Sequence, residues 1–287
     1  MDIRGNARPS TVSWGGEEEL LVGNTSLALW STQHAPPKKI WEKSLANPVH
    51  IGEFSYDASL IASTGESDRL VKIWRRLSIG TEDVQFDFSY LPHPRAVTEI
   101  HWRRPFSREQ SVDNVLYTIA ADGVLRVWAP VYPHDLHLLQ LWAVIDLRES
   151  IPDSLDYEKT MARRSDNRYV MIVDGCVFTH AVESAVCSVT EGERGQEVFQ
   201  RLVEVAKRSP EICVVFDGRG RMSAWGLENV GCRTRRTTNV FSVMHAENSG
   251  MEFVAKGEQE AFVRFHSFSG GAGSSPMLSS RRCRERR

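Results

Sequence analysis

The sequence predicts an all-β fold assembled from a repeated antiparallel hairpin, and three observations lead to this prediction. Residues 57–74 are typical of a turn, a short apolar strand, a polar turn and an alternating strand that ends on a tryptophan. Similar strands, each preceded by an apolar strand, end on a tryptophan elsewhere in the chain. The marker residues are Trp30, Trp74, Trp128 and Trp225. A single hairpin is marginal in water, so these units are expected to stack on one another.

The spacing of these markers predicts the architecture. The interval from Trp30 to Trp74 matches one WD-repeat blade of about 40–45 residues, and the interval to Trp128 matches one blade with a longer loop. The last interval, to Trp225, requires an insertion or a blade whose marker is degenerate. A β-sandwich is the alternative, but it gives no reason for tryptophan to fall at the same place in each unit. We therefore expect an incomplete WD-repeat β-propeller of about four or five blade equivalents.

Individual strands are predicted from short apolar or alternating runs that are bounded by polar turns. The candidate strands span residues 19–22, 27–30, 39–43, 49–54, 60–63, 70–74, 84–90, 97–102, 115–119, 123–128, 138–145, 168–173, 176–182, 212–216, 221–225 and 260–268. Aspartates in the turns, such as Asp57 and Asp122, are expected to bond to nearby backbone groups, which explains them without catalysis.

The part after Trp128 departs from the repeat. Residues 151–166 are polar, charged and without a period, which indicates a loop insertion, and residues 191–208 show the three- and four-residue apolar spacing of an amphipathic helix. This helix either packs on the propeller or docks a partner protein. Its candidate docking positions are Val198, Phe199, Leu202 and Val205.

We expect residues 1–268 to form the partial propeller and residues 269–287 to form a disordered tail. This tail is a glycine and serine linker followed by an arginine cluster. Such a cluster either binds nucleic acid or directs a protein to the nucleus, or it is the product of a truncated or misread reading frame.

Charge and cysteine content exclude several classes of function. The net charge of −2 argues against a general nucleic-acid surface, and the arginine pairs at 75–76, 103–104 and 163–164 are interpreted as solvated loop residues. The five cysteines lack paired spacing, so we expect reduced cytosolic thiols, mostly in the core. No apolar signal segment and no eighteen-residue apolar run are present, which predicts a cytoplasmic protein without a membrane span.

Catalytic motifs are not evident. Gly218 and Gly220 begin like a dinucleotide-binding loop, but Ser223 stands where the last glycine is needed and a strand follows. There is neither an HExxH motif nor an EF-hand loop. We therefore expect no enzyme, no cofactor and no metal; a hydrolase or lyase on a propeller remains the remote alternative.

Several longer phrases resemble one family. These are ANPV at 46–49, EFSYDASLIAS at 53–63, VKIWRRL at 71–77, FDFSYLPHP at 86–94, HWRRP at 101–105, RLVEVAK at 201–207, NVGC at 229–232 and FVRFHSFSGG at 262–271. The chain resembles the N-terminal WD-repeat region of the large RAVE-complex subunit, the fungal relative of the DmX and rabconnectin proteins. The generic WD dipeptide is absent, because Trp74 and Trp128 are followed by Arg75 and Ala129.

The resemblance implies a scaffold that promotes assembly of the vacuolar proton-transporting V-ATPase. Implied partners are the smaller RAVE subunit, a Skp-type adaptor and peripheral V-ATPase subunits, with the protein peripheral at vacuolar or endosomal membranes. No catalytic residues are implied. The family protein is several times longer, with a second propeller and a helical region. A generic WD-repeat adaptor in ubiquitin ligation or vesicle trafficking is the alternative.

Overall fold

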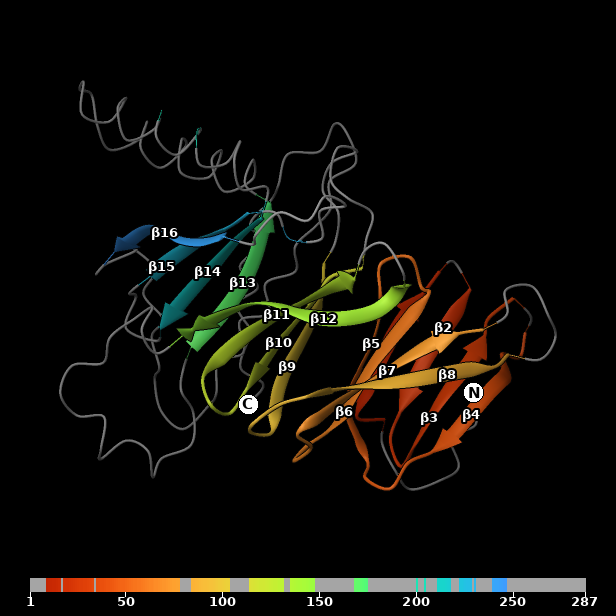
Figure 1. Ribbon diagram of the computed structural model, residues 1–287. Helices are drawn as coiled ribbons and strands as arrows, with labels where there is room; N and C mark the ends of the chain where they lie inside the picture. Colours follow the sequence, from red (N-terminus) through yellow and green to blue (C-terminus); the bar gives the residue numbers. More distant parts are fainter. Residues whose placement is uncertain are drawn as a thin grey trace, which may run out of the picture. The chain divides into compact units, whose positions relative to one another are not determined.

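The computed structural model describes residues 9–16, 18–33, 35–77, 84–103, 114–131, 135–147, 168–174, 200, 204, 211–217, 222–228, 230 and 239–246. These residues form four antiparallel sheets of four strands each (Figure 1). Within each sheet the strands are neighbours in the order of the chain. Four sequential four-stranded meanders are the architecture of WD-repeat propeller blades, which confirms the predicted fold class.

The strands divide between two compact units, each of which is described here by itself. The first unit contains three sheets. They consist of β1 (Thr11–Gly15), β2 (Glu19–Gly23), β3 (Ser26–Ser31) and β4 (Lys38–Ser44); β5 (Val49–Phe54), β6 (Leu60–Gly65), β7 (Leu70–Arg76) and β8 (Phe86–Pro92); and β9 (Val97–Trp102), β10 (Leu116–Ala120), β11 (Val124–Val131) and β12 (Asp135–Asp146). The sheet of the second unit consists of β13 (Arg168–Asp174), β14 (Glu211–Asp217), β15 (Met222–Glu228) and most of β16 (Asn239–Ala246).

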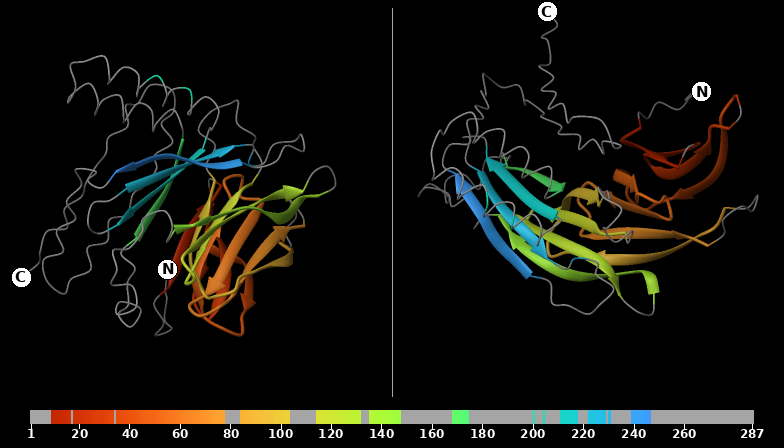
Figure 2. Two further views of the ribbon diagram at one scale, coloured as in Figure 1. Left: turned by 60° about the vertical axis from the view of Figure 1, so that its left-hand side comes forward. Right: turned by 90° about the horizontal axis from the view of Figure 1, so that it is seen from above.

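Burial explains the sequence patterns of the strands in the first unit. The second strand of a sheet, such as β6 or β10, is buried on both faces and is therefore a continuous run of apolar and small residues. The last strand of a sheet alternates instead, as in β8, where most side chains are at least partly exposed. Figure 2 shows the strands of each sheet lying side by side in chain order.

The first strands of the three sheets in the first unit contact one another, β1 against β5 and β5 against β9. On one side Thr11 Oγ1 donates to the carbonyl of Gly52 at 3.0 Å, and on the other Trp102 Nε1 donates to the carbonyl of Glu53 at 3.0 Å. Gly15 allows β1 to approach β5, because a Cβ there would lie 2.5 Å from the ring of Phe54. The sheets of this unit are therefore joined at one end of their strand order.

Most predicted strands that fall within the described residues match an observed strand, but two observed strands were not predicted. These are β1 and β16. The marker tryptophans lie within the third strand of each sheet, which continues past them, rather than at its end. The insertion 151–166, the strands 176–182 and 260–268 and the tail 269–287 lie outside the described residues. Of the helix 191–208, only Gln200 and Glu204 are described, and both are exposed.

Cys213 is buried in β14, where burial raises the pKa of its thiol to about 12. This thiol is therefore protonated and inert at neutral pH, as expected for a core cysteine. No helix among the described residues has the length and apolarity needed to cross a membrane.

Candidate protein-interaction surface

The four marker tryptophans each lie in a different sheet, so the structure does not bring them together into one site. Trp74 is buried in β7 and donates from Nε1 to Ser63 Oγ at 2.9 Å. Trp128 in β11 makes the same bond to Thr118 Oγ1 at 2.8 Å. Trp30 and Trp225 are partly buried in β3 and β15. In β7 and β11 the tryptophan therefore holds the third strand to the second strand from within the core.

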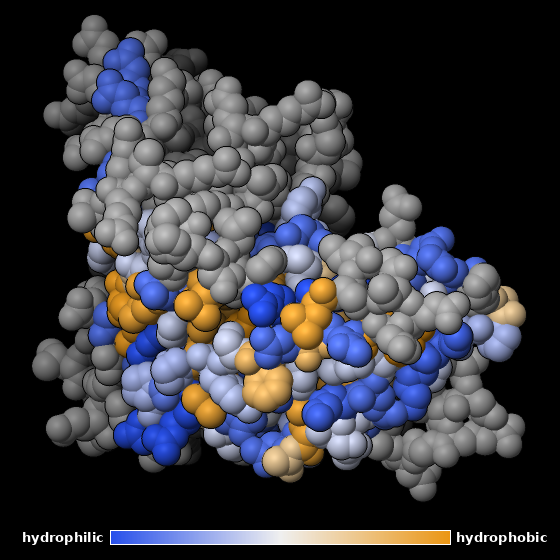
Figure 3. Space-filling view, turned by 45° about the vertical axis from the view of Figure 1, so that its right-hand side comes forward, coloured by the Kyte–Doolittle hydropathy of each residue, from blue (hydrophilic) through white to orange (hydrophobic). Residues whose placement is uncertain are grey.

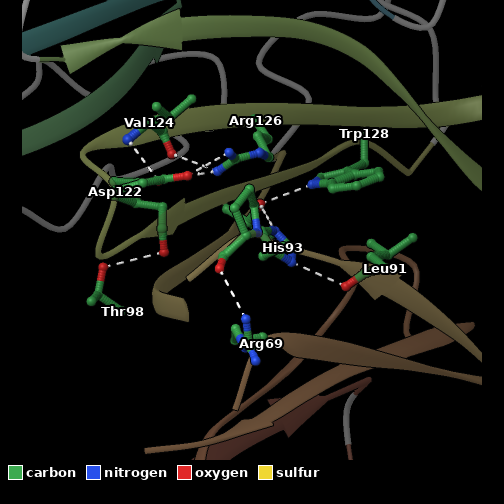
Figure 4. Close-up of polar contacts among 11 residues, drawn as sticks. Arg69, Leu91, His93, Thr98, Asp122, Val124, Arg126 and Trp128 are labelled. Atoms are coloured by element: carbon green, nitrogen blue, oxygen red, sulfur yellow. Dashed lines mark hydrogen bonds and ion pairs between the residues drawn. The ribbon is translucent and has the colours of Figure 1, made fainter. Parts of the chain in front are cut away.

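A buried histidine joins the second sheet to the third (Figure 4). His93 follows β8, its Nδ1 lies 3.0 Å from the carbonyl oxygen of Leu91, and its Nε2 lies 2.7 Å from Thr118 Oγ1. A carbonyl oxygen can only accept, so Nδ1 carries the proton and Nε2 accepts from the hydroxyl of Thr118. The same hydroxyl oxygen accepts from Trp128, which completes a relay from Trp128 through Thr118 and His93 to Leu91.

The environment of His93 keeps its ring neutral. Burial is the largest influence and lowers its pKa, and the positive charge of Arg126 adds to this effect. Asp122 accepts two hydrogen bonds from Arg126, at 3.2 and 2.6 Å, and one from the backbone N–H of Val124 at 3.1 Å. Burial opposes ionisation of Asp122, but these bonds and the charge of Arg126 outweigh it, so the pKa of Asp122 lies below its usual value. His93, Asp122 and Arg126 therefore each have a partner within the fold and a structural role.

A second polar group lies on the first strands of the second and third sheets. His101 Nε2 lies 3.0 Å from Glu99 Oε2 in β9. The side chain of His101 is half exposed; partial desolvation would lower its pKa, but the hydrogen bond to Glu99 and the negative charges of Glu99 and Glu53 raise it above its usual value. Among the described residues no group of three or more His, Cys, Asp or Glu side chains is placed to hold a metal ion.

Aromatic residues gather on one face of β7 and β8. Trp74 is paired in register with Phe88, and Lys72 is paired with Tyr90, so these side chains share a face. The ring centroids of Trp74 and Phe88 are 5.6 Å apart, as are those of Phe88 and Tyr90. Trp41 of β4 continues the row, with its centroid 5.3 Å from that of Trp74 in an edge-to-face arrangement.

The ammonium group of Lys72 lies against these rings. Its Nζ is 3.9 Å from the ring centroid of Trp74, 3.8 Å from that of Phe88 and 5.6 Å from that of Tyr90. Burial lowers the pKa of Lys72, and the nearby charge of Lys43 lowers it further. We call Lys43, Lys72, Phe88, Tyr90 and the adjacent Leu70 the aromatic–lysine surface.

The apolar part of this surface is accessible. Phe88 is 46% exposed, Tyr90 50% and Leu70 45%, whereas Trp74 beneath them is 1% exposed. Figure 3 shows apolar residues lying among hydrophilic ones on the face that it presents. Exposed apolar side chains that adjoin one another mark interaction sites more than single ones do, and aromatic residues are enriched at protein interfaces.

The predicted docking positions Val198, Phe199, Leu202 and Val205 lie outside the described residues. The aromatic–lysine surface was not predicted, although Phe86, Phe88 and Tyr90 alternate in the sequence. That alternation would have indicated an aromatic face, but only the register of β7 with β8 shows that Lys72 lies on it.

The interpretation of the arginine pairs as solvated loop residues was wrong for Arg76 and Arg103, whereas Arg75 is partly exposed but lies on a strand rather than in a loop. Arg75 and Arg76 end β7 and pair with Asp87 and Glu19. Arg103 is buried and donates from Nη2 to the carbonyl of Val230 at 2.7 Å. The guanidinium groups of Arg76 and Arg103 are packed within the fold because their planar donors satisfy a carboxylate and a carbonyl there.

No family model matches the chain. Over 141 residues the chain is 30% identical to the "Regulator of V-ATPase in vacuolar membrane protein 1" of Saccharomyces cerevisiae, which covers 47% of this chain and 10% of the yeast protein. It is 32% identical over 152 residues to mouse DmX-like protein 1, covering 42% of this chain and 5% of the mouse protein. Human DmX-like protein 1 is 31% identical over 151 residues, covering 40% and 5%.

Among solved structures, the chain is similar to Saccharomyces cerevisiae Sqt1, with a TM-score of 0.47 and 10% identity, covering 81% of this chain and 48% of that one. It is also similar to the β-propeller domain of Myceliophteria thermophila Cps50 (Swd1), with a TM-score of 0.45 and 12% identity, covering 83% and 58%. The sequence matches confirm the family resemblance: over the shared segment, this chain is related to the yeast V-ATPase regulator and to the DmX-like proteins.

Proposed function

We propose that this chain is a non-catalytic protein-interaction scaffold that acts in assembly of the vacuolar proton-transporting V-ATPase. The observation that carries the proposal is the 30% identity to a yeast protein named as a regulator of V-ATPase in the vacuolar membrane. Because the shared segment is 10% of that protein, the role proposed is that of one binding region within a larger scaffold.

The described polar groups support a scaffold rather than an enzyme. The relay through His93 and Thr118 and the pair of Asp122 with Arg126 satisfy one another within the fold. Groups whose hydrogen bonds are used in this way hold the blades in register and are not free to act on a substrate. The accessible aromatic side chains, by contrast, provide the kind of surface that protein partners use.

The proposed partners are the smaller RAVE subunit, a Skp-type adaptor and the peripheral subunits of the V-ATPase. The proposed location is the cytoplasm, with peripheral attachment at vacuolar or endosomal membranes through these partners. Each of these assignments follows from the family relationship rather than from a bound molecule.

Affinity capture tests the proposal directly. The purified chain is immobilised and incubated with yeast lysate in which the peripheral V-ATPase sector is detached from the membrane, and retained proteins are identified by mass spectrometry. Recovery of peripheral V-ATPase subunits above a control propeller of unrelated sequence is expected.

A chimera tests the same role inside the larger protein. The matched segment of the yeast regulator is replaced by the corresponding segment of this chain, and vacuolar acidification is followed with a pH-sensitive dye. Retained acidification is expected. Capture of ubiquitin-ligase or trafficking components without V-ATPase subunits, together with lost acidification, would instead favour a generic WD-repeat adaptor.

A further inference from the structure

The exposed aromatic residues on β7 and β8 continue an interior contact out to the surface. Trp41 and Phe86, with centroids 4.7 Å apart, and Trp74 belong to the core between the first two sheets. Phe88 and Tyr90 follow at alternate positions of β8 on the same face, and their exposure rises to about half. The row of aromatic rings therefore extends from the core to the exposed face of β8, with each ring in contact with the next.

The charge on this surface has one sign. Lys43 lies two residues after Trp41 on β4 and raises the local positive potential that Lys72 experiences. Among the described residues no carboxylate pairs with Lys43 or Lys72, whereas the neighbouring Glu42 and Asp87 are engaged by Lys39 and Arg75. Lys72, which lies beside the exposed rings, and Lys43, whose charge acts on it, thus lack the carboxylate partners that Lys39 and Arg75 have.

The outer edge of β8 is poorly suited to strand addition. Asp87 Oδ1 accepts the backbone N–H of Phe88 at 2.7 Å, and Pro92 has no N–H to offer. Both features block an edge against pairing with another strand. A partner is therefore expected to bind through side chains on the face of β8 rather than along its edge.

We propose that the aromatic–lysine surface docks an acidic segment of a partner protein that also carries an apolar or aromatic anchor residue. The anchor packs against Phe88, Tyr90 and Leu70, and its flanking carboxylates pair with Lys43 and Lys72. This inference rests on the scaffold function proposed above and specifies the chemistry of one partner.

A protein segment fits this surface better than a membrane or a nucleic acid. An anionic bilayer or a phosphate backbone requires many cations over a wide area, whereas this surface has two lysines. Aromatic residues around a few charges are instead typical of protein hot spots.

Peptide selection tests the proposal even while the partner protein is unidentified. A phage-displayed library of random peptides is panned on the immobilised full chain, and the enriched peptides are expected to combine Asp or Glu with Phe, Trp or Leu. Panning on the double variant K43E/K72E should reverse the charge preference toward Lys and Arg. Enrichment of peptides without carboxylates, or no enrichment, would overturn the proposal.

The contribution of each side chain is then measured by fluorescence anisotropy with one selected peptide. F88S, Y90S and K72E are each expected to weaken binding by about tenfold or more, as at interface hot spots. Matched controls are K38E, which changes another exposed lysine of β4, and L141S, which changes an exposed leucine of β12. Thermal melts of every variant separate lost binding from lost folding.

Vesicle co-sedimentation and affinity capture of V-ATPase subunits distinguish three outcomes. If phosphatidylcholine vesicles containing phosphatidylserine co-sediment with the chain, and K72E abolishes this while peptide binding is unaffected, the surface is a membrane site and the proposal fails. If V-ATPase subunits are captured by the chain but no acidic peptide is selected on the aromatic–lysine surface, this inference fails and the proposed function stands. If acidic peptides bind as described but no V-ATPase subunit is captured, the proposed function fails and this inference stands.

Discussion

Two histidines that lie eight positions apart in the sequence have opposite electrostatic environments. His93 is buried beside Arg126 and its ring is held neutral, whereas His101 lies beside Glu99 and Glu53, which favour its charged form. Their residue type alone would assign both the same pKa. The difference arises from which neighbours the sheets bring to each ring, so it could not be predicted from sequence.

The pKa shifts of these histidines predict opposite contributions to the pH dependence of stability. The folded pKa of His101 is raised, so its contribution is fully present below the unfolded value of about 6.5 and is lost as pH rises through the folded pKa. The folded pKa of His93 is lowered, so its contribution is present above that value and is lost as pH falls below it. NMR titration of the ring protons should give a higher midpoint for His101 than for His93. Equal midpoints, or no fall for His101 in E99Q, would contradict this.

Thr118 serves both sides of the relay between Trp128 and His93. Replacing it with valine keeps the shape but leaves the indole N–H and the imidazole nitrogen without a partner in the core. T118V is therefore expected to lower the free energy of unfolding by about 1–3 kcal/mol, whereas T118S retains the hydroxyl and should lose much less. Denaturant unfolding followed by tryptophan fluorescence measures both. Equal stability of the two variants would refute the role of the hydroxyl.

At the level of strands, the sequence predicted the segments that carry a tryptophan marker and their apolar neighbours, but it did not predict β1 or β16. β1 alternates, but its apolar residues Val12 and Trp14 are exposed while Thr11 and Ser13 hydrogen-bond to the backbone of β5, the reverse of the apolar inward face on which the prediction relied. β16 follows the last marker and therefore lay outside the repeat pattern. The aromatic–lysine surface was missed for a related reason, because it depends on the pairing of two strands rather than on either one.

The close approach of β1 to β5 depends on Gly15. A methyl group there would lie 2.5–2.6 Å from three ring carbons of Phe54, a buried side chain with little space to move. G15A is therefore expected to destabilise the chain by about 1–3 kcal/mol through overpacking. G16A is a useful comparison, because a Cβ at Gly16 meets nothing within 4 Å and its cost comes from the positive φ of 60° alone. Thermal denaturation should show restored stability in the G15A/F54L double variant, and a lack of rescue would argue against the ring contact.

An ion pair connects β2 of the first sheet to β7 of the second. Arg76 donates to both carboxylate oxygens of Glu19, at 3.0 and 2.6 Å, and the two side chains are only 17% and 22% exposed. A double-mutant cycle with R76M and E19Q is expected to give a coupling of about 1–2 kcal/mol, between the values for surface pairs and for buried charged bonds. The exposed pair of Lys39 with Glu42 provides the control and should give a smaller coupling. A coupling no larger than this control would refute the inter-sheet role.

At the scale of the first unit, hydrogen bonds tie each of the three sheets to the next. Asn114, before β10, donates to both carboxylate oxygens of Asp57 in the turn before β6, at 2.9 and 3.0 Å. Burial opposes ionisation of Asp57, but the bonds from Ser55, Ser59 and Asn114 lower its pKa. These ties could not be predicted from spacing, since the partners lie in different repeats.

Hydrogen exchange measured by mass spectrometry tests this cooperation. The buried strands β6 and β10 should exchange slowest and at similar rates, because opening either sheet breaks contacts with its neighbour. N114A should accelerate exchange in the turn at Asp57 and in β6, with β14 of the second unit serving as the internal control. Acceleration confined to the residues next to Asn114 would indicate that the sheets open independently.

The division into a propeller at 1–268 and a tail at 269–287 stays a prediction.

Two hydrogen bonds between the first strands of neighbouring sheets run from a side chain to a backbone carbonyl. Trp102 and Thr11 donate from their side chains, but the groups that accept, at Glu53 and Gly52, are backbone carbonyls. Every amino acid supplies the same carbonyl, so the side chain at Glu53 can be exchanged without losing the bond, whereas a Cβ added at Gly52 would lie 3.2 Å from the methyl carbon of Thr11. The sequences of adjacent blades can therefore diverge at such positions while their first strands stay aligned, provided that the donating side chain is retained. This tolerance is consistent with a chain that lacks the WD dipeptide after its marker tryptophans and folds as blades.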